Sequence, residues 1–414
     1  MKKILLLILT LVGIIGLAGC INTTTIEGVE FQLNGDLIVN ITTAESYLEL
    51  GYTATDNGED INSYVSSTGT VDSSTPGTYI LKYTLIYNGK TMELIRAINV
   101  VETTEVANPD AILYNGSCAN VQIHYIDLGS MGDSTLIDCG DFEILIDAGL
   151  KSAGTEVIVP YITPFVGDGI LELVIATHPD ADHIGGFVGL SDQDGIFDAF
   201  TVLRVLDYGY TKTTTTHEQY AELRDNSGAL VCSGDDALNS RNLCQPYYTI
   251  TADLILGVID TGHYDGVDTN NDNENSIVVL LEHGERTYLF TGDAEFEAEE
   301  HMATILSHVD VYKAGHHGSK TASSQAMLDS ITPNVIILGV YFPEDDDGEN
   351  GYGIPQQESL DRMFGFTDDI YATGVSGTII ITSDGTSFSV SGALNTTLLK
   401  DSSWFASHRT YPTE

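Results

Sequence analysis

Residues 28–102 alternate between apolar and polar positions in short runs that are separated by turn residues. In YILKYTLIY (residues 79–87) and MELIRAINVV (residues 92–101), every second side chain falls on the same face of a strand, so one face can be buried. The YNGK segment between them supplies the Asn-Gly pair that two-residue hairpin turns favour. The pattern predicts a small all-β sandwich.

Residues 120–395 follow a different pattern, in which short apolar runs end on Asp, His or Gly. Runs such as LELVIATH, RTYLFTGD, VDVYKAG and NVIILGV are typical of buried strands with polar groups at their ends. The segment AEFEAEEHMATILSH has helical spacing of its apolar residues Phe296, Met302, Ile305 and Leu306, which predicts an amphipathic helix. We expect an α/β layered domain with a site at its strand ends.

The N-terminus has the features of an export signal. Lys2 and Lys3 precede an apolar run over residues 4–17, which is short for a membrane span. The ending Leu-Ala-Gly-Cys resembles a bacterial lipobox, which implies cleavage after residue 19 and lipidation of Cys20. A plain signal peptide or an N-terminal anchor is the alternative. We therefore expect an exported lipoprotein on the outer face of the cell membrane, with a linker at residues 103–119.

Composition supports an exported protein. The chain has 60 acidic and 16 basic residues, a formal net charge of −44, and 42% hydrophobic residues. This hydrophobic fraction is sufficient for buried hydrophobic cores, so we expect the acidic side chains to lie on the surface. Such a surface repels polyanions, so a phosphate-bearing substrate would need cations at the site.

Four cysteines remain after Cys20. An even number in an exported protein permits two disulfides, and the pair nearest in sequence is Cys232 and Cys244. The other two are Cys118 and Cys139, and free buried thiols are equally compatible with the sequence. The tail of residues 396–414 is expected to be loosely ordered, although Trp404 and Phe405 could dock on the domain.

One loop concentrates ionisable groups. THPDADHIGG (residues 177–186) follows the run LELVIA and places His178, Asp180, Asp182 and His183 within six positions. Imidazole and carboxylate together are ligands of transition metals. A surface loop with acidic caps is the alternative, but it has no use for both histidines. The loop predicts a metal site.

Two later segments add similar groups. Asp293 ends the run YLFTGD, although a Gly-Asp pair at a strand end is usually a turn or a helix cap. His316 and His317 follow the run VYKAG and precede a Gly-Ser pair, where a purely structural role for both is hard to find. These residues are candidates to complete the site.

The N-terminal region resembles a known repeat. Residues 47–58 fit the run Y-x-x-x-G-Y-x-A-x-D-N-G, and S-T-P-G-T-Y follows at residues 74–79. Both are shared with the bacterial immunoglobulin-like repeats of surface proteins. The resemblance implies a spacer or adhesion module without chemistry of its own.

The C-terminal region resembles the metallo-β-lactamase fold over residues 121–390. The motifs that carry the resemblance are IDLGSMGDS, ILIDAG, ATHPDADHIGG, NENSIVVLLEHGERTYLFTGDAE and VYKAGHHGSK. They are most similar to the ComEC-type competence branch, whose domain acts in DNA uptake. The resemblance implies an αββα sandwich and a site for one or two divalent metals.

The resemblance also implies ligands. His178 and Asp180 take the place of first-metal ligands, and Asp182 and His183 that of second-metal ligands. Asp293 corresponds to the carboxylate that bridges both metals.

The histidine pair and a supporting residue complete the implied set. Either His316 or His317 would be the last ligand, and the other could protonate a leaving group or hold a phosphate. Asp147 takes the place of the supporting aspartate. His317 and Asp182 are the expected catalytic residues.

Two departures from the family pattern bear on the metal. Asp180 stands where most members have histidine, and the histidine expected before the Asp293 strand is absent from residues 274–276. The oxygen-rich shell favours Mn²⁺ or a weakly held Zn²⁺. The expected substrate contacts are Asn275, Ser319 and Lys320.

The chemistry that follows is hydrolysis, because a divalent metal lowers the pKa of bound water to about 7. The leading hypothesis is a surface-anchored phosphodiesterase whose substrate is a phosphodiester, with nucleic acid among the candidates. The alternatives are a hydrolase of a phosphocholine, lipid or lactone ester, and a binding lipoprotein without activity. No protein partner follows from the sequence.

Overall fold

The computed structural model describes residues 23–26, 28–35, 38–42, 47–101, 113–114, 116, 118–191, 193–240, 244–260, 271–343 and 350–412. The predicted signal segment, Cys20 and most of the predicted linker lie outside the described residues. Within the described part of the chain, no helix is long and apolar enough to cross a membrane.

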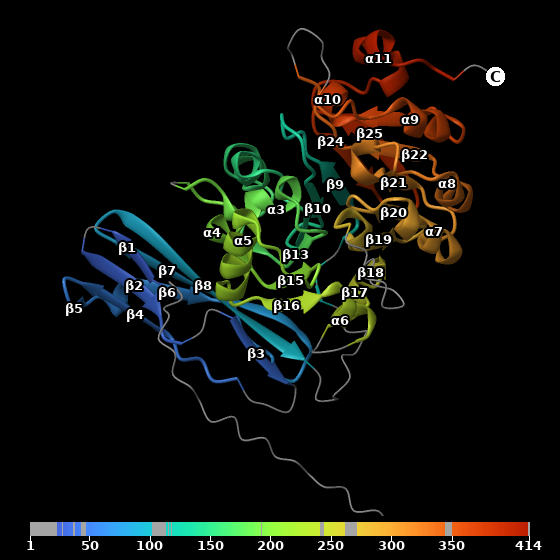
Figure 1. The fold of residues 1–414 in the computed structure, drawn as a ribbon. Coiled ribbons are helices and arrows are strands. Elements are labelled where there is room, and N and C mark those ends of the chain that lie inside the picture. The colour runs from blue at the N-terminus through green and yellow to red at the C-terminus, as the bar shows by residue number, and fades with distance from the viewer. Residues whose placement is uncertain are drawn as a thin grey trace, which may run out of the picture.

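The N-terminal region is a sandwich of two four-stranded sheets (Figure 1). One sheet has the order β1 (Thr23–Ile26), β2 (Val29–Leu33), β4 (Tyr52–Asp56) and β5 (Glu59–Asp60). The other has the order β3 (Ile38–Thr42), β8 (Lys90–Val101), β7 (Gly77–Tyr87) and β6 (Val65–Thr68). Tyr87 pairs with Lys90, and Asn88 and Gly89 both have positive φ, so the predicted Asn-Gly hairpin is confirmed.

The first large sheet lies in the C-terminal region and has eight strands. Its order is β16 (Leu230–Ser233), β15 (Arg204–Asp207), β13 (Leu173–Ala176), β11 (Glu143–Ile146), β10 (Thr135–Asp138), β9 (Val121–Tyr125), β24 (Ile379–Ser383) and β25 (Phe388–Gly392). The strands from β11 to β16 are parallel, whereas β10 is antiparallel to β11.

The second large sheet has seven strands. Its order is β17 (Tyr247–Thr251), β18 (Leu254–Asp260), β19 (Val278–His283), β20 (Arg286–Phe290), β21 (Val311–Lys313), β22 (Val335–Leu338) and β23 (Ile370–Ala372). Here β20 to β23 are parallel, and β19 is antiparallel to β20.

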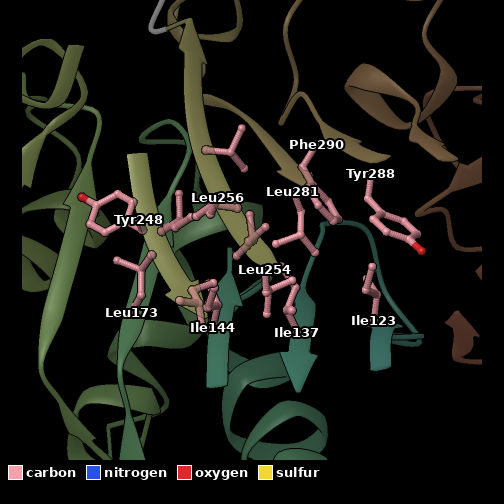
Figure 2. Packing of buried hydrophobic residues seen from close by; sticks show 14 of the residues in the cluster. Ile123, Ile137, Ile144, Leu173, Tyr248, Leu254, Leu256, Leu281, Tyr288 and Phe290 are labelled. Carbon is pink, nitrogen blue, oxygen red and sulfur yellow. The ribbon is translucent and has the colours of Figure 1, made fainter. Parts of the chain in front are cut away.

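Apolar side chains of the two large sheets pack against one another. Ile123, Ile137 and Ile144 of the first sheet face Leu254, Leu281 and Phe290 of the second (Figure 2). All of them are buried, and burial of one such side chain contributes about 1.5–3 kcal/mol. This shared core fixes the positions of the strand ends, where the site lies.

Helices cover the outer face of each large sheet, which gives the predicted αββα order (Figure 1). The first sheet is covered by α1 (Lys151–Ala153), α2 (Val159–Ile162), α3 (Ala181–Val188), α4 (Ile196–Ala199) and α5 (Thr215–Asn226). The second is covered by α7 (Phe296–Ile305), α8 (Gln325–Ile331), α9 (Gln357–Phe364) and α11 (Ser403–His408). Two short helices, α6 (Gly234–Leu238) and α10 (Thr373–Ser376), follow strands β16 and β23.

The predicted amphipathic helix is α7, but its buried face differs from the expected one. Met302 is buried, whereas Phe296 and Ile305 are exposed. Glu299 is buried instead and accepts hydrogen bonds from the backbone N–H groups of Ser323 and Ser324. A satisfied buried carboxylate has thus displaced the apolar side chains that periodicity placed on that face.

The N-terminal sandwich packs against the first large sheet. Ala97 is buried together with Ile170 of β12 (Ile170–Leu171) and Leu203, which follows β14 (Thr201–Val202). Arg204 Nη2 lies 3.4 Å from Thr78 Oγ1. Because β12 and β14 precede the parallel strands β13 and β15, the contact lies at the end of the sheet opposite to the candidate site.

Two disulfides join the four cysteines. Cys118 pairs with Cys139, and Cys232 pairs with Cys244, the pair that is nearest in sequence. The first ties the approach to β9 to the end of β10, and the second ties β16 to the approach to β17.

The C-terminal residues dock on the second sheet through η6 (Leu399–Asp401) and α11. Trp404 stacks on Phe342 with ring centroids 3.8 Å apart and an interplanar angle of 13°. Phe405 is buried in the same cluster. Both aromatic residues therefore pack on the domain, and the expectation of a loosely ordered tail is wrong for residues 399–408.

Candidate metal centre

The strand directions bring the predicted motifs to one edge. Strands β11, β13, β20 and β21 each lead into a polar segment at their carboxyl ends, and the antiparallel strands β10 and β19 begin at that same edge. Segments that are far apart in the sequence therefore meet there.

His183 is held by the aspartate under the first motif. His183 Nδ1 lies 2.8 Å from Asp147 Oδ2, and Thr177 donates to Asp147 from both its backbone N–H and its hydroxyl. Asp147 has a φ of +57°, a region that non-glycine residues seldom adopt. A strained, buried aspartate that orients a histidine is typical of the supporting residue of a metal site.

Asp180 and Asp182 lie at the start of α3. Asp180 is the residue before the helix, and its Oδ2 lies 3.9 Å from Nε2 of His178. Asp182 lies in the first turn, with Oδ2 3.6 Å from His317 Nε2. Burial opposes the charge of Asp182, but His317 and His183 hold its pKa below the usual range.

The glycine pair of the motif lets α3 approach the neighbouring backbone. A side chain at Gly186 would collide with the carbonyl group of Ala148, and one at Gly185 with the backbone of Lys151. The backbone N–H of Ala148 donates to the His183 carbonyl at 2.7 Å. The close contact fixes the loop that carries the ligands.

Asp293 lies at the centre of the group. It is buried, and its backbone N–H donates to the Ser276 hydroxyl at 3.2 Å. Its Oδ2 lies 3.3 Å from His183 Nε2 and 3.5 Å from His317 Nε2. Burial disfavours its charge, but His183 and His317 hold the pKa of Asp293 well below its usual value.

The two histidines of η5 (Gly315–Gly318) differ in their surroundings. Both have left-handed φ values, +45° for His316 and +52° for His317. His317 is buried, and its Nδ1 lies 2.8 Å from the Gly339 carbonyl oxygen, so Nδ1–H donates and Nε2 faces Asp293. His316 is 30% exposed, and its Nδ1 lies 2.8 Å from Glu295 Oε1. The geometry favours His317 as the ligand.

Four buried polar atoms at this edge have no hydrogen-bond partner in the described structure. They are Nε2 of His178, Nε2 of His183, Nε2 of His317 and Oδ1 of Asp293. Unsatisfied buried groups cost about 1–3 kcal/mol each, so several around one point need a ligand. Imidazole nitrogens and a carboxylate are a donor set that suits a divalent cation.

The charges around the histidines also fit a cation. Burial lowers the pKa of His178 to about 3, so this ring is neutral and free to ligate. Burial opposes protonation of His317 as well, but Asp293 and Asp133 raise its pKa to about 10. The carboxylates thus draw positive charge into the cluster, which a metal supplies when it displaces the protons.

Asp133 joins this cluster although the sequence motifs did not single it out. Asp133, His183, Asp293 and His317 can each offer a ligand atom within 4.8 Å of one another. Asp133 also pairs with the buried Lys313, which lies 180 residues away in the chain. It is the second aspartate of the IDLGSMGDS motif, so the signal was present, but its role was not assigned.

Glu295 is a second residue that the motifs did not reveal. It accepts hydrogen bonds from His316, from the Thr321 hydroxyl at 2.6 Å and from the Asn271 amide at 2.8 Å. Burial opposes its charge, but the bonds from His316 and Thr321 lower the pKa of Glu295 to about 2. It follows Asp293 by two positions, inside the quoted TGDAE run.

The three expected substrate contacts are placed differently from one another. Asn275 is buried in η4 (Asn273–Asn275), directly before Ser276 at the site edge. The Ser319 hydroxyl is 2.8 Å from that of Thr321. Lys320 is exposed, and its backbone N–H donates to Gln356. Asn275 is adjacent in sequence to Ser276, whose hydroxyl accepts a hydrogen bond from the backbone N–H of Asp293.

Three known proteins are similar in sequence to this chain. The chain is 28% identical over 260 residues to Recombination protein 2 of Haemophilus influenzae, which covers 62% of this chain and 28% of that protein. It is 25% identical over 232 residues to ComE operon protein 3 of Bacillus subtilis, and the match covers 55% of this chain and 26% of that protein. It is 23% identical over 286 residues to Competence protein ComA of Neisseria gonorrhoeae, and the match covers 66% of this chain and 33% of that protein. The chain thus spans about a third or less of the length of these relatives.

Two family models match the chain. Residues 31–100 match the Ig-like domain of bacterial surface proteins, and residues 128–339 match the metallo-beta-lactamase superfamily. The first match, together with the competence relatives, indicates a surface or membrane-associated protein. The second, with the Asp/His cluster, indicates divalent metal binding and a hydrolase fold. The chain belongs to the metallo-beta-lactamase superfamily and carries a bacterial surface Ig-like domain ahead of its hydrolase fold.

Proposed function

We propose that this protein is a surface-anchored, metal-dependent hydrolase of phosphodiester bonds. The observation that carries the proposal is the set of four unpartnered, buried ligand atoms on His178, His183, His317 and Asp293. Names of relatives that refer to recombination and competence support a phosphodiester, including nucleic acid, as the substrate class.

One or two divalent ions, Zn²⁺ or Mn²⁺, would be held by this edge. His178, Asp180 and Asp293 would form one subsite, with Asn275 beside it. Asp182, His183 and His317 would form the other and share Asp293. When bound, such ions polarise the phosphoryl group and lower the pKa of water.

The side chains around the ions have separate tasks in this proposal. Asp182 is ionised and 30% exposed, so its carboxylate orients the attacking water. His316, held by Glu295, is 30% exposed with Nε2 4.0 Å from Asp293 Oδ2, and it would contact a phosphate oxygen or the leaving group. Asp147 and Thr177 fix the ring of His183. His317, which the sequence offered as a catalytic residue, serves as a ligand.

The test uses the purified chain with Mn²⁺ or Zn²⁺, assayed on DNA, RNA and bis-p-nitrophenyl phosphate. We expect turnover of at least one, and its loss in Asp182→Ala and Asp293→Ala without change in the circular dichroism spectrum. Asp138→Ala, at the far end of β10, is the matched control. Inactivity on all three substrates with metal demonstrably bound would exclude the phosphodiesterase proposal.

Anchoring is a separate part of the proposal. A lipid on Cys20 would hold the protein on the outer face of the membrane, with the Ig-like domain next to it. Metabolic labelling with a fatty-acid probe should mark the wild-type chain and leave Cys20→Ala unmarked. Equal labelling of both chains would exclude lipidation at this residue.

A further inference from the structure

A pocket of about 560 Å³ opens beside the metal centre. Its wall includes Asp182, whose Oδ2 lies 3.6 Å from His317 Nε2, so the pocket is adjacent to the candidate metal ligands. A group that fills it would therefore be attached to the bond that reacts. Its volume falls in the range of pockets that take small organic groups.

The described residues that line this pocket form a weakly apolar surface and include no cation. Those that bear on its chemistry are Met131, Asp182, Tyr341, Pro343, Asn350 and Tyr352. Asp182 is the charged member, and it faces the metal centre. A second phosphate or another anion would meet no cationic side chain among these residues, and the net charge of −44 would repel it further.

Two tyrosines are among the residues that line the pocket. Tyr352 is 73% exposed, so its ring is accessible to a ligand. Tyr341 lines the pocket too, and Met131 and Pro343 add further apolar surface. Tyrosine rings stack on planar groups, and one base on one aromatic side chain contributes about 1–3 kcal/mol.

Hydrogen bonds and ring stacking support the rim of the pocket. Asn350 donates to the carbonyl oxygens of Tyr341 and Ile354 and accepts from the backbone N–H of Ile354. Phe342, between two pocket residues, stacks on Trp404 of α11. These contacts hold the backbone of Tyr341 and Ile354 in place, which reduces the entropy that this part of the pocket loses when it is filled.

We infer that this pocket receives a planar, uncharged ring attached to the scissile phosphoryl group, and that Tyr341 and Tyr352 determine this specificity. The inference rests on the proposed function for its substrate bond. It predicts a preference for an ester with one negative charge and an adjoining ring over a substrate with a second phosphate at that place.

The first experiment measures binding, which does not require turnover. Phenylphosphonate and methylphosphonate are titrated calorimetrically into the metal-loaded full chain. We expect phenylphosphonate to bind at least tenfold more tightly, and Tyr352→Ala to remove most of that ratio. Tyr352→Phe should retain it, and Tyr247→Ala, an exposed tyrosine on β17, is the control. Equal affinities in the wild type would overturn the inference.

The second experiment measures turnover. Bis-p-nitrophenyl phosphate and methyl p-nitrophenyl phosphate share a leaving group and differ in the flanking group. Tyr352→Ala should lower kcat/KM about tenfold for the aryl ester and leave the methyl ester within twofold, at unchanged metal content. A similar loss on both esters would overturn the specificity role.

The charge of the pocket has its own test. The 5′-p-nitrophenyl ester of thymidine monophosphate is compared with the same ester phosphorylated at its 3′ position. We expect the wild type to prefer the first at least fivefold and Met131→Lys to reduce that preference. A wild-type preference for the second ester would overturn the inference. Selective phenylphosphonate binding without hydrolysis of any ester would refute the proposed function and leave the pocket assignment standing.

Discussion

Nδ1 of His183 lies 2.8 Å from Oδ2 of Asp147, which turns Nε2 of the same ring toward Asp293 at 3.3 Å. The aspartate thus selects which nitrogen is available to a metal. Asp147 is itself fixed by two hydrogen bonds from Thr177. A partner of this kind acts on affinity without touching the ion.

Asp147→Asn should therefore weaken metal binding about 10- to 100-fold. The amide can keep the Thr177 contacts, but it orients His183 less strongly than a carboxylate does. Isothermal titration with Zn²⁺ measures the change, and Asp168→Asn, remote from the edge, is the control. Unchanged affinity would show that Asp147 serves folding alone.

The histidine pair allows a direct comparison. His317→Ala should lower metal affinity at least 100-fold, because it removes a buried ligand atom. His316→Ala should change affinity only a few-fold, because its ring is 30% exposed and bound to Glu295. Metal content after dialysis distinguishes the two variants. A greater loss of metal from His316→Ala than from His317→Ala would assign the ligand role to His316.

Lys313 and Asp133 form a buried ion pair under the cluster. Lys313→Met should lower the free energy of unfolding by about 3 kcal/mol, since it removes the buried cation that pairs with Asp133 and leaves His317, 3.5 Å from Asp133 Oδ1, as the nearest remaining partner. The double variant Lys313→Met/Asp133→Asn should recover part of this loss. Thermal unfolding of the metal-free chains measures both, and equal stability of the single and double variants would rule out the pairing.

Glu143 and Glu172 give the fold a pH dependence. Both are buried at the end of the first sheet that faces the N-terminal sandwich, and Glu172 accepts from the backbone N–H of Glu143 at 2.8 Å. Burial, and then the charge of Glu172, raise the pKa of Glu143 to about 10, and burial raises that of Glu172 to about 8. Arg204 faces Glu172, and Asp138, Asp141 and Asp168 add negative charge.

Because these folded-state pKa values lie above the unfolded value of 4.5, their contribution to stability is complete below pH 4.5. It is lost as the pH rises toward 8 and then 10. Glu143→Gln should unfold at a higher temperature than the wild type at pH 8.5 and at a similar one at pH 4.5. Glu282→Gln, exposed on β19, is the control. A difference that is the same at both pH values would contradict the assignment.

The helix α11 supports the pocket wall. Trp404→Ala should destabilise the domain by about 3 kcal/mol, because a buried ring that stacks on Phe342 is removed. It should also raise KM more than it lowers kcat, since Tyr341 and Pro343 adjoin Phe342. Steady-state kinetics below the melting temperature test this prediction. An unchanged KM would show that the pocket wall does not depend on α11.

Local patterns were sufficient for much of the fold. The β7–β8 hairpin follows from a period of two and one Asn-Gly pair, both of which are short-range signals. The ligand loop was readable because four ionisable groups fall within six residues. The helix α7 was found by its period, but its buried face was not. Periodicity weighs apolar side chains, whereas Glu299 is buried by hydrogen bonds from a distant loop.

By itself the sequence determined the two layered regions, the superfamily and the segments that carry the metal chemistry, because each depends on neighbours along the chain. Only the tertiary structure decided that the buried His317 lies closer to Asp293 than His316 does (3.5 Å against 4.0 Å from Nε2 to Oδ2), that Asp133 joins the cluster, and that a pocket with two tyrosines in its lining adjoins Asp182. These relationships arise where strands from both sheets end at one edge. Strand direction and sheet packing set such distances, and neither is encoded in spacing along the chain.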